Sequence, residues 1–428
     1  MMRRLVFILV LLGIYIVKIA VGNKVDYSGQ QVWRVTPNSP EEVKSLRELE
    51  EKFEVDFWTE PTSPGRFVDF RVKPKQFFEL ANALNRMSGY EIYISDVQSL
   101  IINEKLSHNK RKNLGKALAS SVQAFDYSQY HPAKEVYQWM DLVTSEYSFA
   151  TKEQFGVTFE GRPLYVLKFE KPSAKSKPTI VVDALIHCRE WITTASLMFI
   201  FKEMLQNPSF THMMDEVNWY FVPMINVDGY VETWIGDRLW RKTRSTGPNS
   251  NCPGVDANRN FDSYWSNEGA SGNPCEFSYY GPTPESESEV RHLVKYVMGQ
   301  GKIDAYVTTH SYTQLILYPY GYTSTPCADD AVLNATSKLM HDAMKAVHGK
   351  TYTYGPSSTT IYVTSGTTTD WSYDVAGIVQ SYTFELRDTG RYGFILPADQ
   401  IIPNGEEYLA GLEVLSNYVR DNYEGSGM

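Results

Sequence analysis

The sequence predicts an α/β fold with a mixed, mostly parallel central sheet and helices on both faces, preceded by a small α+β ferredoxin-like domain. From about Ser120 onward, apolar runs of strand length alternate with helical patterns, as in α/β proteins. Several of these runs are apolar throughout, which is typical of strands covered on both faces. Before that point, shorter segments follow the order β-α-β-β-α-β, the split βαβ pattern.

The composition allows a sizeable core and excludes a basic binding surface. The chain has 428 residues, long enough for two domains or for one large domain with an appendage. Its hydrophobic content is 43% and its aromatic content is 14%, so we do not expect overall disorder. The formal net charge of −9 and the lack of a Lys/Arg-rich stripe argue against nucleic acid as a partner.

Residues 1–22 have the pattern of a secretory signal peptide. Residues 1–4 form a basic segment, residues 5–17 are apolar, and residues 20–22 are small enough for cleavage. A signal anchor is the alternative, but the apolar run is shorter than the ~20 residues that a membrane span needs. No second apolar run approaches that length. We therefore expect a secreted, extracellular protein with no membrane contact after cleavage.

Residues 23–106 are predicted to form the small first domain. The predicted strands are 31–35, 55–58, 67–72 and 90–94, and the predicted helices are 40–53 and 74–87. The second and third strands form a hairpin around residues 61–65. Nothing in this domain looks catalytic.

Residues 107–118 are predicted to link the two domains. A connecting helix over 96–106 is followed at 110–116 by a basic stretch without apolar periodicity. Exposed segments of this kind are preferred sites of proteolysis. We favour processing by a trypsin-like protease over the alternative, a solvated linker that is not cut.

Residues 119–428 are predicted to form the main domain. Its predicted strands are 165–168, 179–185, 219–224, 303–309, 315–318 and 378–386. Its predicted helices are 134–145, 192–205, 285–297, 328–347 and 405–419. Functional sites in such sheets gather at the carboxyl ends of the strands.

A histidine and a glutamate stand where one predicted strand gives way to a helix. His187 and Glu190 lie between the strand at 179–185 and the helix at 192–205. Imidazole nitrogen and carboxylate oxygen are both zinc donors, and a catalytic zinc keeps three protein ligands and one open position. The motif alone is weak, because a structural histidine followed by a surface glutamate has the same pattern.

Two further residues lie at the ends of predicted strands. His310 follows the strand at 303–309, and Glu385 stands near the end of the strand at 378–386. His310 supplies a third ligand. A carboxylate that lies near a metal without binding it is suited to act as the general base for metal-bound water. Most lone histidines at strand edges are structural, so the hypothesis depends on the whole set.

The four cysteines would lie in an oxidising compartment if the protein is secreted. Cys252 and Cys275 bracket a region rich in Gly, Asn and Ser, which favours a disulfide across a loop. Cys188 and Cys327 either pair or stay free, because four cysteines allow three connectivities.

Six motifs together resemble the zinc metallocarboxypeptidases of the digestive carboxypeptidase A/B type in their proenzyme form. The motifs are HCREW at 187–191, RLWRKTR at 238–244, DANRNF at 256–261, HSYTQLILYPYG at 310–321, IY at 361–362 and TFELRDTG at 383–390. The resemblance covers essentially everything after residue 22. It implies the zinc carboxypeptidase fold, one Zn²⁺ per chain, a monomer, and hydrolysis of the C-terminal residue of peptides and proteins.

The resemblance assigns the chemistry to residues within these motifs. It implies three zinc ligands: His187, Glu190 and His310. Asp256 would orient a ligand imidazole. Glu385 would take a proton from zinc-bound water and pass it to the leaving amine. Arg241 would stabilise the developing oxyanion together with zinc, an effect of about 3 kcal/mol per donor.

The resemblance also implies a site for a free α-carboxylate. Arg259 would hold the carboxylate through two hydrogen bonds, and Asn258 would add a neutral donor. Tyr362 would cap the terminal residue as a mobile phenol. Arg189 and Tyr312 would line the neighbouring subsites.

The resemblance also implies roles for regions outside the active site. Residues 23–106 become an inhibitory pro-domain, and cleavage at 110–116 gives a mature chain that begins near 117–121. Cys252 pairs with Cys275. Two positions depart from the family pattern: Cys188, where alanine or serine is usual, and Val227, where proline is common.

The base of the pocket for the C-terminal side chain corresponds to Thr369. Aspartate there favours Lys or Arg, and isoleucine favours aromatic and aliphatic residues. With no buried negative charge, a bound cation would lack a partner and its desolvation would be costly. Ser357 and Thr367 make the walls small and mildly polar. We expect a preference for neutral apolar or aromatic residues, with a B-type (Lys/Arg) or unusual preference as the alternative.

Two other functional classes compete with this hypothesis. A non-catalytic secreted binding protein on the same fold is disfavoured, because Glu385, Arg241 and all three ligands are present together. An endopeptidase is disfavoured, because Asn258 and Arg259 favour a free carboxylate.

Overall fold

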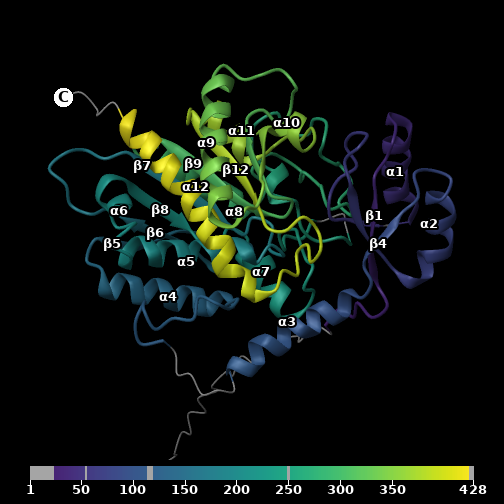
Figure 1. Ribbon diagram of the computed structural model, residues 1–428, viewed down its shortest axis with the longest axis horizontal. Coiled ribbons are helices and arrows are strands. Elements are labelled where there is room, and N and C mark those ends of the chain that lie inside the picture. Colours follow the sequence, from purple (N-terminus) through teal and green to yellow (C-terminus); the bar gives the residue numbers. More distant parts are fainter. Residues whose placement is uncertain (1–23, 54, 113–118, 248–250, 424–428) are drawn as a thin grey trace, which may run out of the picture.

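The computed structural model describes residues 24–53, 55–112, 119–247 and 251–423 (Figure 1). The predicted signal peptide at 1–22 lies outside these residues. Within the described ranges, no helix is both long enough and apolar enough to cross a membrane.

The small first domain has the element order that the sequence predicts. Its four-stranded antiparallel sheet has the order β2-β3-β1-β4. The strands are β1 (Gln31–Val35), β2 (Asp56–Phe57), β3 (Val68–Val72) and β4 (Glu91–Ile94), and the helices are α1 (Pro40–Phe53) and α2 (Phe77–Leu84), the latter preceded by the 3₁₀ turn η1 (Pro74–Gln76). The helices bury Leu46 and Leu80 against Trp33 and Phe70 of the sheet. The four strands and two helices of the first domain thus share a hydrophobic core of their own.

The connection to the main domain is more helical than expected. Helix α3 covers Val97–Lys112, whereas the sequence predicts a helix that ends near residue 106. Lysine and arginine are good helix formers, so a helix can continue through a basic stretch that lacks apolar periodicity. The rest of the predicted linker, residues 113–118, lies outside the described residues.

The main domain is built on an eight-stranded mixed sheet of order β11-β10-β12-β9-β7-β8-β6-β5. The strands are β5 (Ala150–Val157), β6 (Pro163–Phe169), β7 (Thr179–Ala184), β8 (Asn218–Val222), β9 (Ala305–Ser311), β10 (Leu315–Tyr318), β11 (Thr353–Pro356) and β12 (Gln380–Leu386). The centre, β12-β9-β7-β8, is parallel throughout. β5 and β6 are antiparallel to their neighbours, and β10 is antiparallel to β12. The predicted mixed, mostly parallel sheet is confirmed.

Helices cover both faces of this sheet (Figure 1). One face carries α4 (Ala133–Glu146), α5 (Ile192–Gln206), α6 (His212–Glu216), α9 (Asp330–His348) and α12 (Ile401–Asp421), and the other carries α8 (Ser288–Met298) and α11 (Thr368–Asp374). Short helices α7 (Val227–Ile235) and α10 (Ser357–Thr360) and the 3₁₀ turns η2 (Ala257–Arg259) and η3 (Ala398–Gln400) lie in connections.

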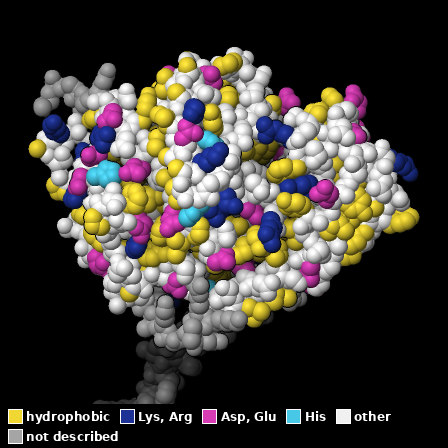
Figure 2. Space-filling view, viewed as in Figure 1, with side chains coloured by type: hydrophobic (Ala, Val, Ile, Leu, Met, Phe, Trp, Pro, Cys, Tyr) yellow, Lys and Arg dark blue, Asp and Glu magenta, His cyan; other side chains and the backbone are white. Residues whose placement is uncertain are grey.

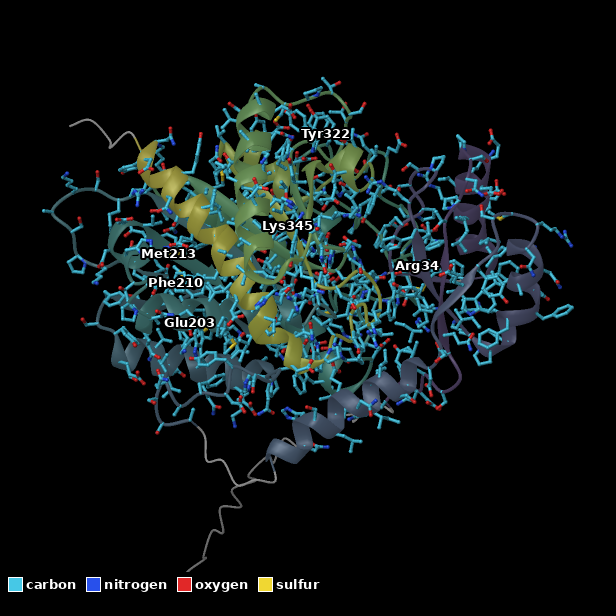
Figure 3. The ribbon with its side chains drawn as sticks, in the orientation of Figure 1. Arg34, Glu203, Phe210, Met213, Tyr322 and Lys345 are labelled. Atoms are coloured by element: carbon cyan, nitrogen blue, oxygen red, sulfur yellow. A yellow bond between two sulfur atoms is a disulfide. The ribbon has the colours of Figure 1, made fainter. Side chains whose placement is uncertain are left out.

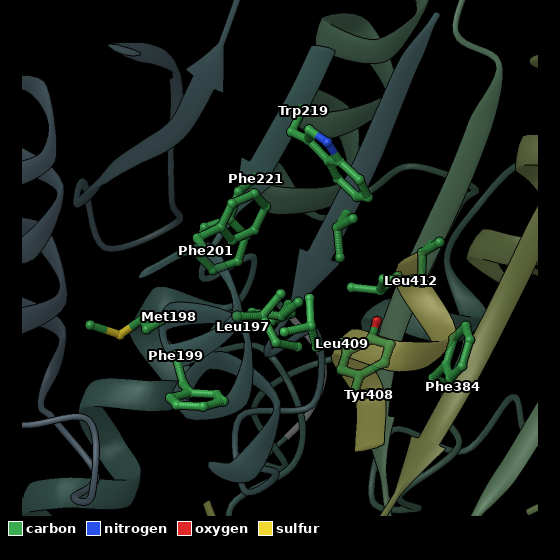
Figure 4. Close-up of a cluster of buried hydrophobic side chains, with 14 of the residues drawn as sticks. Leu197, Met198, Phe199, Phe201, Trp219, Phe221, Phe384, Tyr408, Leu409 and Leu412 are labelled. Atoms are coloured by element: carbon green, nitrogen blue, oxygen red, sulfur yellow. The ribbon is translucent and has the colours of Figure 1, made fainter. Parts of the chain in front are cut away.

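The central strands are apolar throughout because they contribute to a core on each face. In β7, Ile180 and Val182 belong to the larger core and Val181 to the smaller one, as the period of two in a strand requires. Figure 4 shows part of the larger core, where Phe201 of α5 packs on Phe221 of β8 with ring centroids 4.7 Å apart. This rigid centre holds the carboxyl ends of β7, β9 and β12 side by side.

Charged side chains on the face seen in Figure 2 are mixed in sign and form no continuous basic stripe. Figure 3 shows Arg34 of β1 on the side of the first domain that faces the main domain, where its guanidinium donates to the carbonyl of Thr389 at 2.8 Å. The two domains therefore meet along the edge where the central strands end.

Candidate active site

The predicted metal ligands lie at neighbouring strand ends. His187 and Glu190 follow β7, and His310 lies in β9, which pairs with β7 in parallel. Strand β9 continues to Ser311, beyond the predicted end at 309, so His310 is held by the sheet itself. Glu385 on β12 is the direct neighbour of His310 in the parallel ladder. These four chemically active side chains therefore come from three adjacent strands and the turn that follows one of them.

The donor atoms of His187, Glu190 and His310 converge on one point. Nδ1 of His187 lies 2.9 Å from Oε1 of Glu190, and Nδ1 of His310 lies 3.2 Å from Oε2 of Glu190. The two Nδ1 atoms are 3.1 Å apart, a distance at which two positively charged imidazoles would repel each other. All three residues are buried. Two nitrogens and a carboxylate in this arrangement fit the donor set of a catalytic zinc.

Asp256 fixes the orientation of His187 from the side away from the cluster. Its Oδ1 lies 3.0 Å from Nε2 of His187, and its Oδ2 accepts a hydrogen bond from Arg241 at 2.7 Å. Burial alone would raise the pKa of Asp256, but the charges of Arg241 and His187 hold it well below its usual range. An ionised Asp256 keeps the Nε2 proton of His187 in place, which leaves Nδ1 free to bind a metal.

The two glutamates of the site, Glu190 and Glu385, have pKa values that are shifted in opposite directions. Burial raises the pKa of Glu190, but the charges of His187 and His310 outweigh it and lower the pKa to about 2. Burial raises the pKa of Glu385 to about 8, and the neighbouring Glu190 adds to this effect. Glu190 is thus a permanent anion suited to hold a cation. The raised pKa suits Glu385 to exchange a proton, which general acid–base chemistry requires.

A second group of residues lines the same cavity and carries hydrogen-bond donors for an anion. Arg259 is 3% exposed, and its guanidinium donates to the Tyr362 hydroxyl at 3.2 Å. Oδ1 of Asn258 accepts from Thr368, so its amide nitrogen is turned toward His310 at 3.4 Å. Because Arg259, Asn258 and Arg241 surround one cavity with the metal cluster, a bound carboxylate would have several donors.

The first domain covers this cavity, and two predicted subsite residues are engaged by it. Arg189 donates to Asp56 of β2 at 3.1 Å, and Tyr312 donates to Asp69 of β3 at 2.9 Å. Trp58 packs on Tyr312 with ring centroids 6.4 Å apart. The cavity, of about 500 Å³, is therefore lined by both domains.

The acidic residues that the first domain brings to this cavity were not predicted from the sequence. Asp56 and Asp69 are buried, and Glu60 lines the cavity among Arg241 and Arg259. Burial raises the pKa of Glu60, and the charges of Arg259 and Arg241 oppose that rise. The available signal was an acidic residue in each of two short strands, Asp56 in β2 and Asp69 in β3.

Thr369, which the resemblance places at the base of the side-chain pocket, is one of the residues that line the cavity. It stands in the first turn of α11, and its hydroxyl is hydrogen bonded to that of Thr383 on β12. Ser357 and Thr367 line the same region.

Two of the cysteines are paired and two are not. Cys252 and Cys275 form a disulfide, as the sequence favours, and Cys188 and Cys327 are free and buried. The thiol of Cys188 donates to the carbonyl of Trp240 at 2.8 Å, and burial raises its pKa well above the usual value. Cys188 is therefore an inert thiol rather than a further metal ligand.

Comparisons with known proteins agree with this architecture. Residues 136–411 match the family described as zinc carboxypeptidase, and residues 33–104 match the carboxypeptidase activation peptide. Carboxypeptidase A1 of Bos taurus is 41% identical over 96% of this chain and 99% of its own. Carboxypeptidase A2 of Mus musculus is 39% identical over 92% of this chain and 95% of its own.

Two solved structures have the same fold over almost the whole chain. Thrombin activatable fibrinolysis inhibitor superposes with a TM-score of 0.83 at 33% identity, covering 92% of this chain and all of that one. Carboxypeptidase A from Helicoverpa armigera superposes with a TM-score of 0.85 at 26% identity, covering 94% of this chain and all of that one. The family implies zinc, which the His-Glu-His cluster fits. The chain belongs to the zinc carboxypeptidase family and is a metallocarboxypeptidase that carries the family's activation peptide.

Proposed function

We propose that this protein is a secreted zymogen whose activated form removes the C-terminal residue of peptides through Glu385 and a zinc ion held by His187, Glu190 and His310. One observation carries the proposal: the three-donor cluster, the Glu385 carboxylate and the guanidinium of Arg259 line one cavity. A site with these three features can hold a terminal carboxylate beside a metal and a base. A free carboxylate is what distinguishes a C-terminal residue from the rest of a peptide.

Each side chain has a separate task in this proposal. Arg259 and Asn258 bind the α-carboxylate, and Tyr362 closes over the terminal residue. Glu385 accepts a proton from the attacking water and returns it to the leaving amine. Arg241, fixed by Asp256, donates to the oxygen that gains negative charge. Zinc, when bound, would supply a Lewis acid that activates water and polarises the scissile carbonyl.

Residues 23–106 act in this proposal as the inhibitory pro-domain. They hold Arg189 and Tyr312, the groups that would line the neighbouring subsites, through Asp56 and Asp69. A trypsin-like protease that cuts at 110–116 would let the pro-domain leave and release a monomeric enzyme. Secretion follows from the signal-peptide pattern at 1–22.

The pocket favours a neutral C-terminal side chain. Thr369 and Thr383 bring no charge to its inner end, so neither a cation nor an anion would find a partner there. The sequence predicts an apolar or aromatic residue within this neutral class, an expectation that the hydroxyl-rich lining of the pocket weighs against.

The direct test is hydrolysis by the trypsin-treated protein of two peptides that differ only in their C-terminus, a free acid or an amide. We expect cleavage of the acid and at least about a hundredfold slower cleavage of the amide, because the amide cannot form the charged bonds to Arg259. A zinc chelator should abolish the activity and added zinc should restore it. Equal cleavage of acid and amide would indicate an endopeptidase. Zinc binding without cleavage of either peptide would indicate a binding protein.

A further inference from the structure

The inner end of the active-site cavity is lined mainly by hydroxyl groups. Apart from Tyr362, the lining residues of segment 357–369, together with the cross-strand pair on β10 and β12, are two apolar and five hydroxyl-bearing side chains: Leu317, Ile361, Ser357, Thr364, Thr367, Thr369 and Thr383. The charged residues of the described cavity lining lie elsewhere, on the first domain or around the metal cluster. A pocket for an aromatic or aliphatic side chain would be expected to be mostly apolar.

Strand geometry places this region next to the catalytic carboxylate. Thr383 and Glu385 are two residues apart on β12, so both side chains lie on the same face, roughly 7 Å apart along the strand. Leu317 on β10 is the cross-strand partner of Thr383, and Leu315 is that of Glu385. A side chain that extends inward past Glu385 therefore meets Leu317 and Thr383 first.

The end of this region is formed by two threonines that share one hydrogen bond. The hydroxyls of Thr369 and Thr383 are bonded to each other, which uses only one of their two protons. One O–H therefore remains available to donate, and both oxygens have lone pairs left. Thr369 and Thr383 are 4% and 8% exposed, so water reaches them only through the cavity.

The side walls supply complementary hydrogen-bonding capacity. Thr367 caps α11 by accepting from the backbone N–H of Asp370 at 3.3 Å, which leaves its own proton free to donate. Ser357 donates to the carbonyl of Tyr318 at 3.1 Å, which leaves its oxygen free to accept. The pocket thus offers both donors and acceptors but no formal charge.

We propose that this pocket selects a C-terminal residue with a carboxamide side chain, glutamine or asparagine. A carboxamide has one acceptor oxygen and two N–H donors without net charge, which matches the mixed and neutral lining. A hydrocarbon side chain would displace water from these hydroxyls and leave them without partners, and a charged one would be desolvated without a counter-ion. This inference rests on the proposed function and names its substrate class.

The test uses the trypsin-activated protein and a set of peptides that differ only in the last residue. Gln is compared with Met, which has the same length without polar hydrogen-bonding groups, with Glu, which has the same shape with a charge, and with Phe and Arg. We expect kcat/KM for Gln to exceed that for Met and Phe at least tenfold and that for Glu and Arg more. A preference for Met or Phe over Gln would overturn the inference while leaving the proposed function intact. No cleavage of any peptide would overturn both.

Isosteric variants locate the effect in the pocket. Thr369→Val and Thr383→Val each keep the volume and remove a hydroxyl, so we expect the Gln-to-Met ratio of kcat/KM to fall toward one. The matched control is Thr351→Val, a threonine at the exposed rim of the same cavity, which should leave the ratio unchanged. A ratio that survives in both pocket variants would contradict the assignment.

Discussion

The two walls of the active-site cavity are built in opposite ways. The main domain supplies cations and metal-binding groups on strands buried in the centre of the sheet, such as His310 on β9. The first domain supplies carboxylates: Glu60 lines the cavity, and Asp56 on β2 and Asp69 on β3 bond to lining residues of the main domain. One wall is part of a large core, whereas the other has its own core and touches the first through side chains.

The contacts between the walls combine buried ion pairs with a small apolar cluster, in which Trp58 of the first domain packs on Phe394 of the main domain. Asp56 bonds to Arg189, and Glu104 on α3 bonds to Arg238 at 2.7 Å. The attraction within a buried pair is largely offset by the cost of desolvating both ions, and the ions are well solvated again once the domains separate. In the proposed activation the catalytic wall stays in place, and the wall that covers it leaves.

The greatest loss of activity should follow a change in the catalytic wall. Glu385→Gln keeps the shape of the side chain but cannot accept a proton, so the activated variant should lose about 10³-fold in kcat. The control is Glu289→Gln, at another buried glutamate whose pKa burial raises to about 7 but which lies outside the cavity. Its activity should stay within about twofold. Retention of activity by Glu385→Gln would show that the proton acceptor is a different group.

A lesser loss is expected from the carboxylate-binding residues of the same wall. Arg259→Gln removes the charged donor that faces a terminal carboxylate, and we expect kcat/KM to fall about 10²-fold. Steady-state kinetics on a free-acid peptide measure the loss. The same change should leave the slow hydrolysis of the matching amide unaffected, so an equal loss on both peptides would contradict the role of Arg259.

A gain of about one order of magnitude is expected when the contact between the walls is broken. Asp56→Asn leaves Arg189 buried without its ion-pair partner, which should raise the activity of the uncleaved protein about tenfold or more by weakening pro-domain docking. The measurement is hydrolysis of a small peptide before trypsin treatment. Glu91→Gln, on the exposed edge strand β4, is the control and should not change this activity.

A pH dependence of that same contact should be the weakest of these effects. Burial raises the pKa of Asp56, but Arg189 and Arg71 outweigh it and the net pKa is lowered. Because docking lowers the pKa of Asp56, its carboxylate stabilises docking fully above the usual aspartate pKa of about 4. This stabilisation is lost as the pH falls through the lowered pKa. The binding of the cleaved pro-domain should therefore differ between wild type and Asp56→Asn at about pH 6 and converge at acidic pH. A difference that persists at the lowest pH would contradict the ionic basis of the contact.

The fold was predictable where side chains repeat a clear pattern. The buried central strands were found because they are apolar throughout, as in Thr179–Ala184. Strand β5, Ala150–Val157, was missed because it lies at the edge of the sheet, is largely exposed and mixes charge with small residues. Helix α11, Thr368–Asp374, was missed because threonine is a weak helix former. It forms because Thr367 caps it and Trp371 is buried.

The site was predictable where its residues lie in short motifs, and unpredictable where it depends on docking. His187 and Glu190 are close in sequence, and His310 stands at a strand end, so the whole set of motifs in order locates them although each motif alone is weak. The pairing of Asp56 with Arg189 joins residues 133 positions apart in two domains. No local pattern specifies such a contact, because it arises only when the two cores are placed against each other.

The decisive measurement follows peptide hydrolysis by one preparation through trypsin treatment, while size-exclusion chromatography separates the cleaved pro-domain from the main domain. We predict that activity on a free-acid peptide rises as the pro-domain leaves and that a zinc chelator abolishes it at every stage. Full activity with the pro-domain still bound, or activity that survives the chelator, would contradict a zinc site covered by a removable wall.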